Sequence, residues 1–269
     1  MSRVAVIQMT SGGDWQANLQ TAYSLLQQAA QAGAQLAVLP ENFALMGHHE
    51  TDKLRIAESE GGGPLQDWLC NSARQLGLWI VAGTLPLRVP NERRVAAACL
   101  VANAQGEIVA RYDKIHLFDV DVTDATQQYR ESNTLAPGQQ ITVVDTSVGR
   151  LGLAICYDVR FPELFRQLSA QGAELLVLPA AFTVPTGQAH WEVLLRARAI
   201  ENLCYMLAAG QVGDHDNGRA TYGHSMIIDY WGEIKALSAA GAGVACAEID
   251  LSQLHAQRQR FPALAHRRL

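Results

Sequence analysis

The chain has 269 residues, of which 49% are hydrophobic and 17% are charged, and its formal net charge is −5. This composition supplies enough apolar side chains for a substantial core and excludes a largely disordered chain. The acidic balance gives no reason to expect nucleic acid or a membrane surface as a partner, because both recruit basic patches. At this length one core is still sufficient, so we expect a single domain over residues 1–269.

The N-terminus and the cysteines favour a cytoplasmic protein. The apolar run at residues 4–7 is too short for a secretion signal, and the other apolar runs are too short to span a membrane. The five cysteines are an odd number and include no C-x-x-C pair, so neither a disulfide framework nor a zinc site is indicated. Free thiols in a reducing compartment fit this pattern.

Hydrophobic periodicity predicts mixed strands and helices along the whole chain. In the first half we expect a strand at 3–9, a helix at 15–31, a strand at 36–39, a helix at 64–76, and strands at 78–83, 95–101 and 107–112. In the second half we expect strands at 141–144 and 150–155, a helix at 162–171, a strand at 174–178, a helix at 188–203, strands at 205–211, 221–229, 233–237 and 243–249, and a last helix at 251–260.

One segment of the chain is repeated. Residues 33–40 read GAQLAVLP, and residues 172–179 read GAELLVLP. Each copy follows a predicted helix and contains a strand that ends in proline, which favours two related α/β halves. Continuous hydrophobic strands of this kind are typical of sheets covered by helices.

Cys156 is a candidate nucleophile because it lies between a hydrophobic strand and a helix that begins near Pro162. Open α/β sheets place reactive groups at the carboxyl ends of their strands. Backbone N–H groups at such an elbow can lower a thiol pKa and stabilise an oxyanion. The alternative is a cysteine that only packs in the core, which also describes the remaining cysteines, Cys70, Cys99, Cys204 and Cys246.

Two other strand ends carry groups that could assist a thiol. Glu41 follows Pro40 at the end of one strand, where it could act as a general base. Lys114 ends another strand and could stabilise an acyl oxygen as it becomes anionic. A solvated carboxylate and a surface lysine are the alternative interpretations of these two positions.

The three regions together resemble the signature segments of the nitrilase (carbon–nitrogen hydrolase) superfamily. The segments are Pro40-Glu41, RYDKIHL at 111–117 and ICYDVRFPEL at 155–164, in the superfamily's order. The similarity continues through residues 182–192 and 222–226 to 266–268, and it is greatest with the Nit branch. The chain departs from the family in one visible place, at residues 228–232, where relatives usually have proline in the position of Tyr230.

The resemblance implies a four-layer αββα sandwich with two pseudo-symmetric halves. It implies a Glu41–Lys114–Cys156 triad that hydrolyses an amide through a thioester, with Glu131 assisting in positioning or proton transfer. It implies neither a metal nor an organic cofactor. Nit-branch relatives form dimers, and residues 261–268 resemble the tail that they lay across the partner, so a homodimer or a higher homo-oligomer is expected.

The substrate is expected to be a small amide that carries a carboxylate. Arg160 lies four residues after the nucleophile, where its guanidinium could grip a carboxylate, and the other candidate binding residues are Tyr157, Phe182 and Thr186. The chain resembles branch members that hydrolyse deaminated glutathione to 2-oxoglutarate and cysteinylglycine. ω-Amidase activity on 2-oxoglutaramate is the alternative.

Other classes stay open at this stage. Cys156 could pair with His190 or His224 as in papain-like enzymes, whereas Ser225 lacks the closing glycine of a serine nucleophile elbow. The neighbouring residues His48 and His49 lack the spacing of a metal hydrolase. A binding protein on a hydrolase scaffold is the remaining alternative, since fold alone does not prove turnover.

Overall fold

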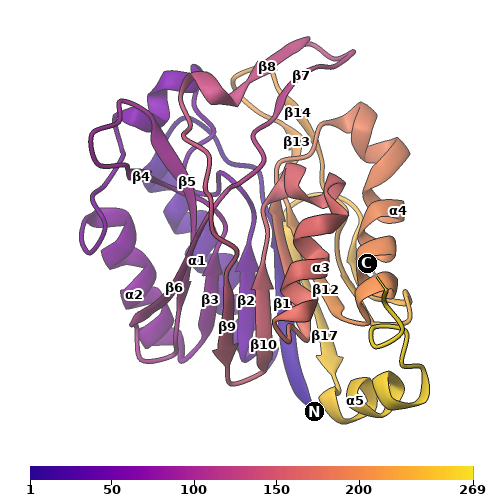
Figure 1. Ribbon diagram of the computed structural model, residues 1–269. Helices are drawn as coiled ribbons and strands as arrows, with labels where there is room; N and C mark the ends of the chain where they lie inside the picture. Colours follow the sequence, from indigo (N-terminus) through magenta and orange to yellow (C-terminus); the bar gives the residue numbers. More distant parts are fainter. Residues whose placement is uncertain (269) are drawn as a thin grey trace.

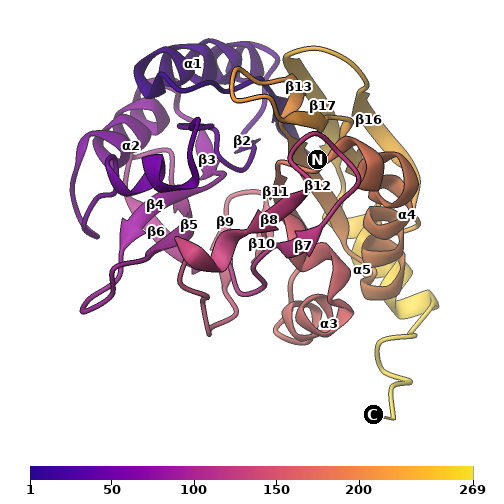
Figure 2. The same ribbon diagram turned by 90° about the horizontal axis from the view of Figure 1, so that it is seen from above.

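The structure is a computed structural model that describes residues 1–268. Two sheets lie face to face, and helices cover the outer face of each (Figures 1 and 2). The strand order is β17-β1-β2-β3-β5-β4 in the first sheet, with β6 paired to β5, and β16-β15-β12-β11-β10-β9 in the second. The expected four-layer αββα sandwich is therefore confirmed.

The first half of the chain builds most of the first sheet and its helices. Its elements are β1 (Ser2–Gln8), α1 (Trp15–Gln31), β2 (Leu36–Leu39), η1 (Glu50–Leu54), α2 (Pro64–Leu76), β3 (Trp79–Ala82), β4 (Leu85–Arg88), β5 (Val95–Ala102), β6 (Ile108–Asp113), β7 (Asp119–Asp121), β8 (Gln128–Arg130) and η2 (Glu131–Asn133). Asp14 caps α1, because its carboxylate accepts the N–H groups of Gln16 and Ala17.

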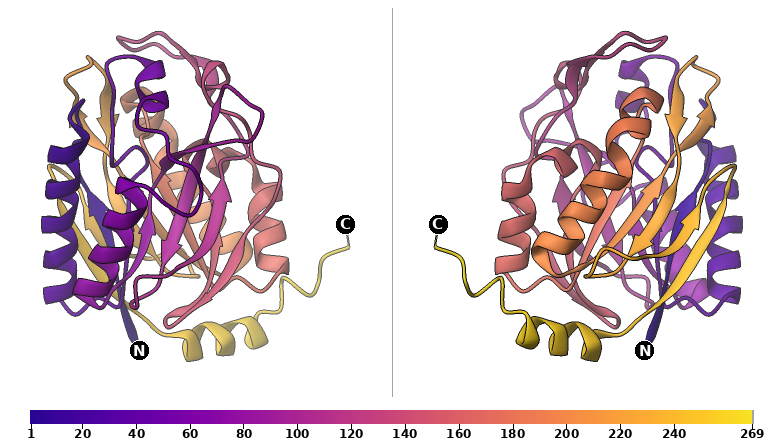
Figure 3. Two further views of the ribbon diagram at one scale, coloured as in Figure 1. Left: turned by 90° about the vertical axis from the view of Figure 1, so that its left-hand side faces the viewer. Right: turned by 90° about the vertical axis from the view of Figure 1, so that its right-hand side faces the viewer.

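The second half builds the second sheet and returns one strand, β17, to the first. Its elements are β9 (Val143–Thr146), β10 (Gly149–Leu153), η3 (Cys156–Arg160), α3 (Pro162–Ala170), β11 (Leu175–Ala180), α4 (Val184–Asn202), β12 (Tyr205–Gly210), β13 (Val212–Asp214), β14 (Ala220–Tyr222), β15 (Ser225–Ile228), β16 (Ile234–Ser238), β17 (Gly243–Ile249) and α5 (Leu251–Arg260). Helix α5 lies across one end of the sandwich, and the tail after it extends away from the body (Figure 3).

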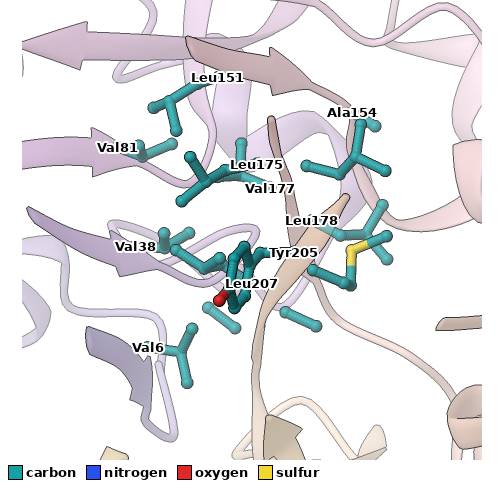
Figure 4. Packing of buried hydrophobic residues seen from close by; sticks show 14 of the residues in the cluster. Val6, Val38, Val81, Leu151, Ala154, Leu175, Val177, Leu178, Tyr205 and Leu207 are labelled. Carbon is teal, nitrogen blue, oxygen red and sulfur yellow. The ribbon is translucent and has the colours of Figure 1, made fainter. Parts of the chain in front are cut away.

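Alternating side chains of the central strands build two cores. In β1, Ala5 and Ile7 face α1 and α2, whereas Val4 and Val6 face the second sheet. Figure 4 shows Val6 and its neighbours in this inner layer opposite side chains of β11 and β12 such as Leu207. Because both faces of these strands are buried, the strands are hydrophobic throughout.

The repeated segment marks equivalent positions in the two halves. Gly33 and Gly172 both adopt left-handed backbone conformations, with φ of 82° and 90°. Two residues later the N–H of Gln35 donates to β1 over 2.8 Å, and the N–H of Glu174 donates to β10 over 2.9 Å. The hydrogen bonds thus repeat along with the sequence, as two related halves require.

Several element boundaries differ from the sequence-based expectation. Helix α4 begins at Val184 instead of 188, because Pro185 fits the first turn of a helix and does not break it. The strand predicted at 221–229 is two strands, because Gly223 and His224 take positive φ values of 69° and 54° between them. Strand β4 was missed because it contains Pro86, which an edge strand tolerates.

Tyr230 does not disturb its turn. The N–H of Gly232 donates to the carbonyl of Asp229 over 2.9 Å, and the Asp229 carboxylate accepts the N–H of Trp231 over 2.9 Å. The ring of Tyr230 packs edge-on against Tyr205, with ring centroids 5.4 Å apart. The hydrogen bonds of Asp229 close this turn without the proline of the relatives.

The parallel strands of both sheets end at the same edge of the sandwich. Strands β1, β2 and β3 run parallel, as do β10, β11 and β12, and a parallel bridge between Met9 and Gln211 joins the two sets at their carboxyl ends. In Figure 1 this is the end where β7, β8, β13 and β14 lie. Among residues 1–268, no helix is both long and apolar enough to cross a bilayer.

Candidate active site

Three strand ends bring Glu41, Lys114 and Cys156 together at this edge. Glu41 comes two residues after β2, Lys114 follows β6 directly, and Cys156 begins the short turn η3 after β10. All three residues are buried, with exposed fractions of 3%, 1% and 7%. The geometry therefore assembles the three groups that the sequence singled out separately.

Lys114 is held between two carboxylates. Its Nζ atom lies 2.8 Å from Oε1 of Glu41, and 3.0 and 2.8 Å from Oε1 and Oε2 of Glu131. Burial alone would lower the pKa of the ammonium, but the charges of Glu131 and Glu41 outweigh it and raise the pKa of Lys114 well above its usual value. Lys114 is thus a fixed positive charge in a closed environment.

Glu131 also has a fixed position. One carboxylate oxygen accepts the N–H of Phe118 over 2.8 Å, in addition to the contacts with Lys114. Burial would raise the pKa of Glu131, but the charges of Lys114 and then of Lys53 outweigh it and lower the pKa. A second carboxylate therefore holds the ammonium in place in addition to Glu41.

Cys156 lies on a strained elbow that Asp158 stabilises. The φ angle of Cys156 is 47°, a left-handed conformation that costs a non-glycine residue about 1–3 kcal/mol. The fully buried carboxylate of Asp158 accepts the N–H of Ile155 over 2.8 Å and the hydroxyl of Tyr112 over 2.7 Å, and its other oxygen lies 2.7 Å from Nδ1 of His116. Asp158 thereby ties the cysteine segment to the segment that carries Lys114.

The surroundings of Cys156 raise the pKa of its thiol. Burial raises its pKa well above the ordinary value, and the negative charge of Glu41 adds to that effect. The charge of Lys114 and the N–H of Ala181 oppose the rise without cancelling it. With two carboxylates and one ammonium around it, the site disfavours a further negative charge on sulfur.

The thiol opens into a pocket at this edge of the sandwich. Its lining includes Glu41, Glu131 and Cys156 together with Tyr157, Phe182 and Thr186, which were expected to bind substrate. Arg160 is not in that lining; its guanidinium lies 5.8 Å from the ring centroid of Tyr157 and 5.3 Å from that of Phe182. Arg160 therefore lies against two walls of the pocket, within 3.3 Å of His190 Nδ1.

Four residues of the site were not singled out from the sequence. Asp158 positions the elbow of Cys156. Ala181 positions the Glu41 carboxylate, which accepts its N–H over 2.9 Å. Asn42 and Arg219 line the pocket. Asp158 could have been found, because it belongs to the matching segment at 155–164, whereas no motif pointed to Arg219.

The two histidines considered as partners of Cys156 have other contacts. His190 lies beside Arg160, and Nδ1 of His224 is 2.9 Å from the carbonyl of Tyr222. Burial has the largest effect on the thiol pKa, followed by the charges of Glu41 and Lys114. The geometry therefore favours the Glu–Lys–Cys arrangement over a thiol–imidazole pair.

Comparison with known proteins decides the family. The family described as "Carbon-nitrogen hydrolase" matches residues 3–259. The chain belongs to this family. It is accordingly an enzyme that hydrolyses carbon–nitrogen bonds of amides.

The carbon-nitrogen hydrolase is similar to several curated proteins along almost its whole length, each named "Deaminated glutathione amidase". The protein of Yersinia enterocolitica is 45% identical over 99% of this chain and 93% of its own length. That of Synechocystis is 48% identical over 98% of this chain and 97% of its own length. The human protein is 43% identical over 98% of this chain and 82% of its own length.

Solved structures share the fold of the hydrolase. The Caenorhabditis elegans NitFhit protein matches with a TM-score of 0.92 and 38% identity over 99% of this chain, which spans 65% of that longer protein. Saccharomyces cerevisiae Nit3, a member of branch 10 of the nitrilase superfamily, matches with a TM-score of 0.89 and 30% identity, covering 100% of this chain and 97% of its own. A mutant of the amidase from Nesterenkonia sp. AN1 matches with a TM-score of 0.80 and 26% identity, covering 97% of this chain and 98% of its own. That structure shows the result of Michael addition of acrylamide at the active-site cysteine.

Proposed function

We propose that the hydrolase cleaves its amide through a thioester on Cys156. In the first step the thiol proton passes to the Glu41 carboxylate as Sγ attacks the amide carbonyl. The carbonyl oxygen becomes anionic beside the Lys114 ammonium, which stabilises it. Collapse of the tetrahedral intermediate breaks the carbon–nitrogen bond, and the amine leaves with the proton that Glu41 returns.

Hydrolysis of the thioester would follow the same path with water in place of the thiol. Glu41 accepts a proton from the water, the hydroxide oxygen attacks the acyl carbon, and the carboxylic acid and the Cys156 thiol are released. Glu131 keeps Lys114 in place through both steps. The single observation that carries this proposal is the contact of Lys114 with both Glu41 and Glu131 beside the thiol.

The pKa directions fit this order of events. A thiol that is protonated at rest needs a base within reach, and burial and the charge of Glu41 raise the pKa of Cys156. Transfer of the proton to Glu41 removes that negative charge as the sulfur becomes anionic. The net charge of the buried group is then unchanged by the transfer, which avoids the cost of adding a charge in a closed site.

We propose deaminated glutathione as the substrate, hydrolysed to 2-oxoglutarate and cysteinylglycine. The support is the similarity to the three amidases of that name, at 43–48% identity. Arg160, which packs on Tyr157 and Phe182, is proposed to bind the carboxylate of the 2-oxoglutaryl group. Tyr157, Phe182 and Thr186 would then enclose the acyl chain.

The test compares kcat/KM for deaminated glutathione and for 2-oxoglutaramate, on the wild type and on Arg160→Ala. The proposal predicts a preference for deaminated glutathione and a loss of about 10-fold or more on both substrates in the variant, since they share the acyl carboxylate. A preference for 2-oxoglutaramate would favour an ω-amidase instead. Unchanged kinetics in Arg160→Ala would remove the carboxylate contact from the account.

We also propose that the chain is one domain, located in the cytoplasm, that forms a homodimer. Its five cysteines are free, in keeping with a reducing compartment. Val193 and Ile200, seven residues apart on one face of α4, are exposed, and the side chain of Ile200 lies beside Gly232. Trp231 and Phe261 continue this patch with ring centroids 5.8 Å apart, so an exposed apolar face is available for a second copy.

A further inference from the structure

The space around the nucleophile continues past Asn42 toward η1 and the β13–β14 hairpin. Asn42 lines the pocket of Cys156 and two neighbouring cavities, the first against Pro86 and Leu135 and the second against Met46 and His49. Glu41 lines the pocket and the first cavity, and Arg219 lines the pocket and the second cavity. The catalytic pocket is therefore one part of a longer space.

Two cations border this extension. Lys53 from η1 lines both neighbouring cavities, and Arg219 precedes β14. Their side chains are 20% and 17% exposed, so both are mostly buried in the wall and not extended into solvent. The charge of Lys53 also contributes, after that of Lys114, to the lowered pKa of Glu131.

A carboxylate of the chain itself already occupies a position between these cations. Oε2 of Glu50 lies 2.7 Å from Nζ of Lys53, and its Oε1 lies 3.9 Å from Nη1 of Arg219. The Glu50 side chain is 46% exposed, so it can move into solvent at little cost. The two cations thus hold a carboxylate in a position that a ligand carboxylate could take.

The loops that carry these groups are connected to each other. Nδ2 of Asn217 donates to the carbonyl of Gly47 over 2.8 Å, and the N–H of Met46 donates to the carbonyl of Gly12 over 3.0 Å. Arg219 also lies over the ring of Tyr129, with its guanidinium carbon 5.1 Å from the centroid. The positions of the two cations are therefore set before any ligand binds.

The direction of the extension relative to Glu41 indicates which half of the substrate it receives. In the proposed mechanism Glu41 protonates the leaving nitrogen, so this nitrogen must lie within hydrogen-bond distance of its carboxylate. Glu41 lines both the pocket of Cys156 and the cavity that Lys53 borders, whereas Arg160 lies outside both linings, against Tyr157 and Phe182. A substituent on the leaving nitrogen would then point toward Lys53 and Arg219.

We propose that Lys53 and Arg219 form a subsite for a carboxylate on the leaving half of the substrate. This inference rests on the proposed function, in which the leaving group is a dipeptide and ends in a carboxylate. An extended dipeptide spans about 7 Å, which carries its carboxylate well beyond the scissile bond. Binding of this carboxylate displaces Glu50 from the two cations. The subsite thereby favours a substrate whose leaving group is a peptide over one that releases ammonia.

The test pairs enzyme variants with altered substrates. The substrates are deaminated glutathione and the same molecule with its C-terminal carboxylate converted to a carboxamide. Lys53→Met and Arg219→Met should each lower kcat/KM for the carboxylate substrate about 10- to 100-fold more than for the carboxamide, the usual range for a hydrogen bond to a charged group. Equal losses on both substrates would overturn the subsite.

Arg55→Met is the matched control, because Arg55 also belongs to this segment but its side chain is 82% exposed; its kinetics should match the wild type on both substrates. Glu50→Gln should lower KM for the carboxylate substrate alone, by about 2- to 10-fold, since a competitor is removed. No gain in that variant would contradict the displacement. Turnover of 2-oxoglutaramate reports whether each variant retains a folded catalytic centre.

The failure of the two proposals can be told apart. If the wild type cleaves neither deaminated glutathione nor its carboxamide, the proposed substrate is wrong and the subsite falls with it. If the wild type cleaves both with equal kcat/KM, the substrate stands and the carboxylate subsite is refuted.

Discussion

The Nζ atom of Lys114 lies 2.8 Å from Oε1 of Glu41, although 73 residues separate the two along the chain. The other oxygen of Glu41 accepts the N–H of Ala181 over 2.9 Å. Both oxygens of the proposed base are therefore fixed, one by a cation and one by the backbone, beside the Cys156 thiol. This arrangement sets the protonation of the thiol and leads to predictions about each group.

Replacing Lys114 with methionine should lower kcat by about 10²–10³-fold or more, because the developing oxyanion loses its positive partner. It should also destabilise the fold by about 3–5 kcal/mol, since Glu41 and Glu131 are left as buried carboxylates without their cation. Steady-state kinetics and denaturant unfolding measure the two effects. An unchanged kcat with a raised KM would make Lys114 a substrate-binding group instead.

Replacing Glu41 with glutamine should separate thiol reactivity from turnover. Burial and then the Glu41 charge raise the pKa of Cys156, so the pH at the midpoint of the iodoacetamide alkylation rate should fall in Glu41→Gln. Amide hydrolysis should fall by about 10²–10⁴-fold, because the proton acceptor is lost. Glu163→Gln, at an exposed carboxylate of α3, is the control and should change neither. A midpoint that rises in Glu41→Gln would contradict the electrostatic account.

Stability should decline in alkaline solution, in part through Cys204. Burial raises the pKa of this thiol from 9.0 to about 11, so the unfolded chain releases the proton at a lower pH than the folded one. The stabilisation is fully present below pH 9 and is lost as the pH rises to 11. The free energy of unfolding should fall between pH 8 and 11 in both the wild type and Cys204→Ala. The decrease should be about 2 kcal/mol smaller in Cys204→Ala, which lacks this thiol. Parallel pH profiles would contradict this prediction.

The exposed patch on α4 should support self-association. Light scattering should give a dimer or a larger species at micromolar concentration, and Trp231→Glu should shift it toward the monomer, because a charge would be buried at the contact. Ile108→Glu is the control, since Ile108 is 37% exposed on β6 of the other sheet. A wild-type monomer under these conditions would refute the homodimer.

The hydrophobic strands and the repeated segment predicted two related α/β halves, and the resemblance to the nitrilase superfamily added the four-layer sandwich. Helix α1 and strand β17 begin and end where their patterns indicated. Boundaries failed where a local rule was overridden by tertiary contacts. Gly187 in α4 looks unfavourable in a helix, yet a Cβ atom there would lie 2.3 Å from the ring of Tyr222, so packing requires the glycine.

The candidate site was predictable only in part. Glu41, Lys114 and Cys156 each come at or just after the end of a predicted strand, a local signal that can be found without coordinates. Lys53 and Arg219 carry no such signal. They are connected only through Glu50, which contacts Lys53 three residues away and Arg219 169 residues away along the chain. Such a contact depends on how two loops meet, which composition and periodicity do not specify.

The most direct test of the account is mass spectrometry of the enzyme quenched with acid during turnover of deaminated glutathione. The peptide that contains Cys156 should gain the mass of 2-oxoglutarate less one water, the mark of the thioester. Cys156→Ala should show no adduct and no hydrolysis while it remains folded, and Cys204→Ala should show both. An acyl group on any other residue, or hydrolysis at the wild-type rate by Cys156→Ala, would contradict the proposed mechanism.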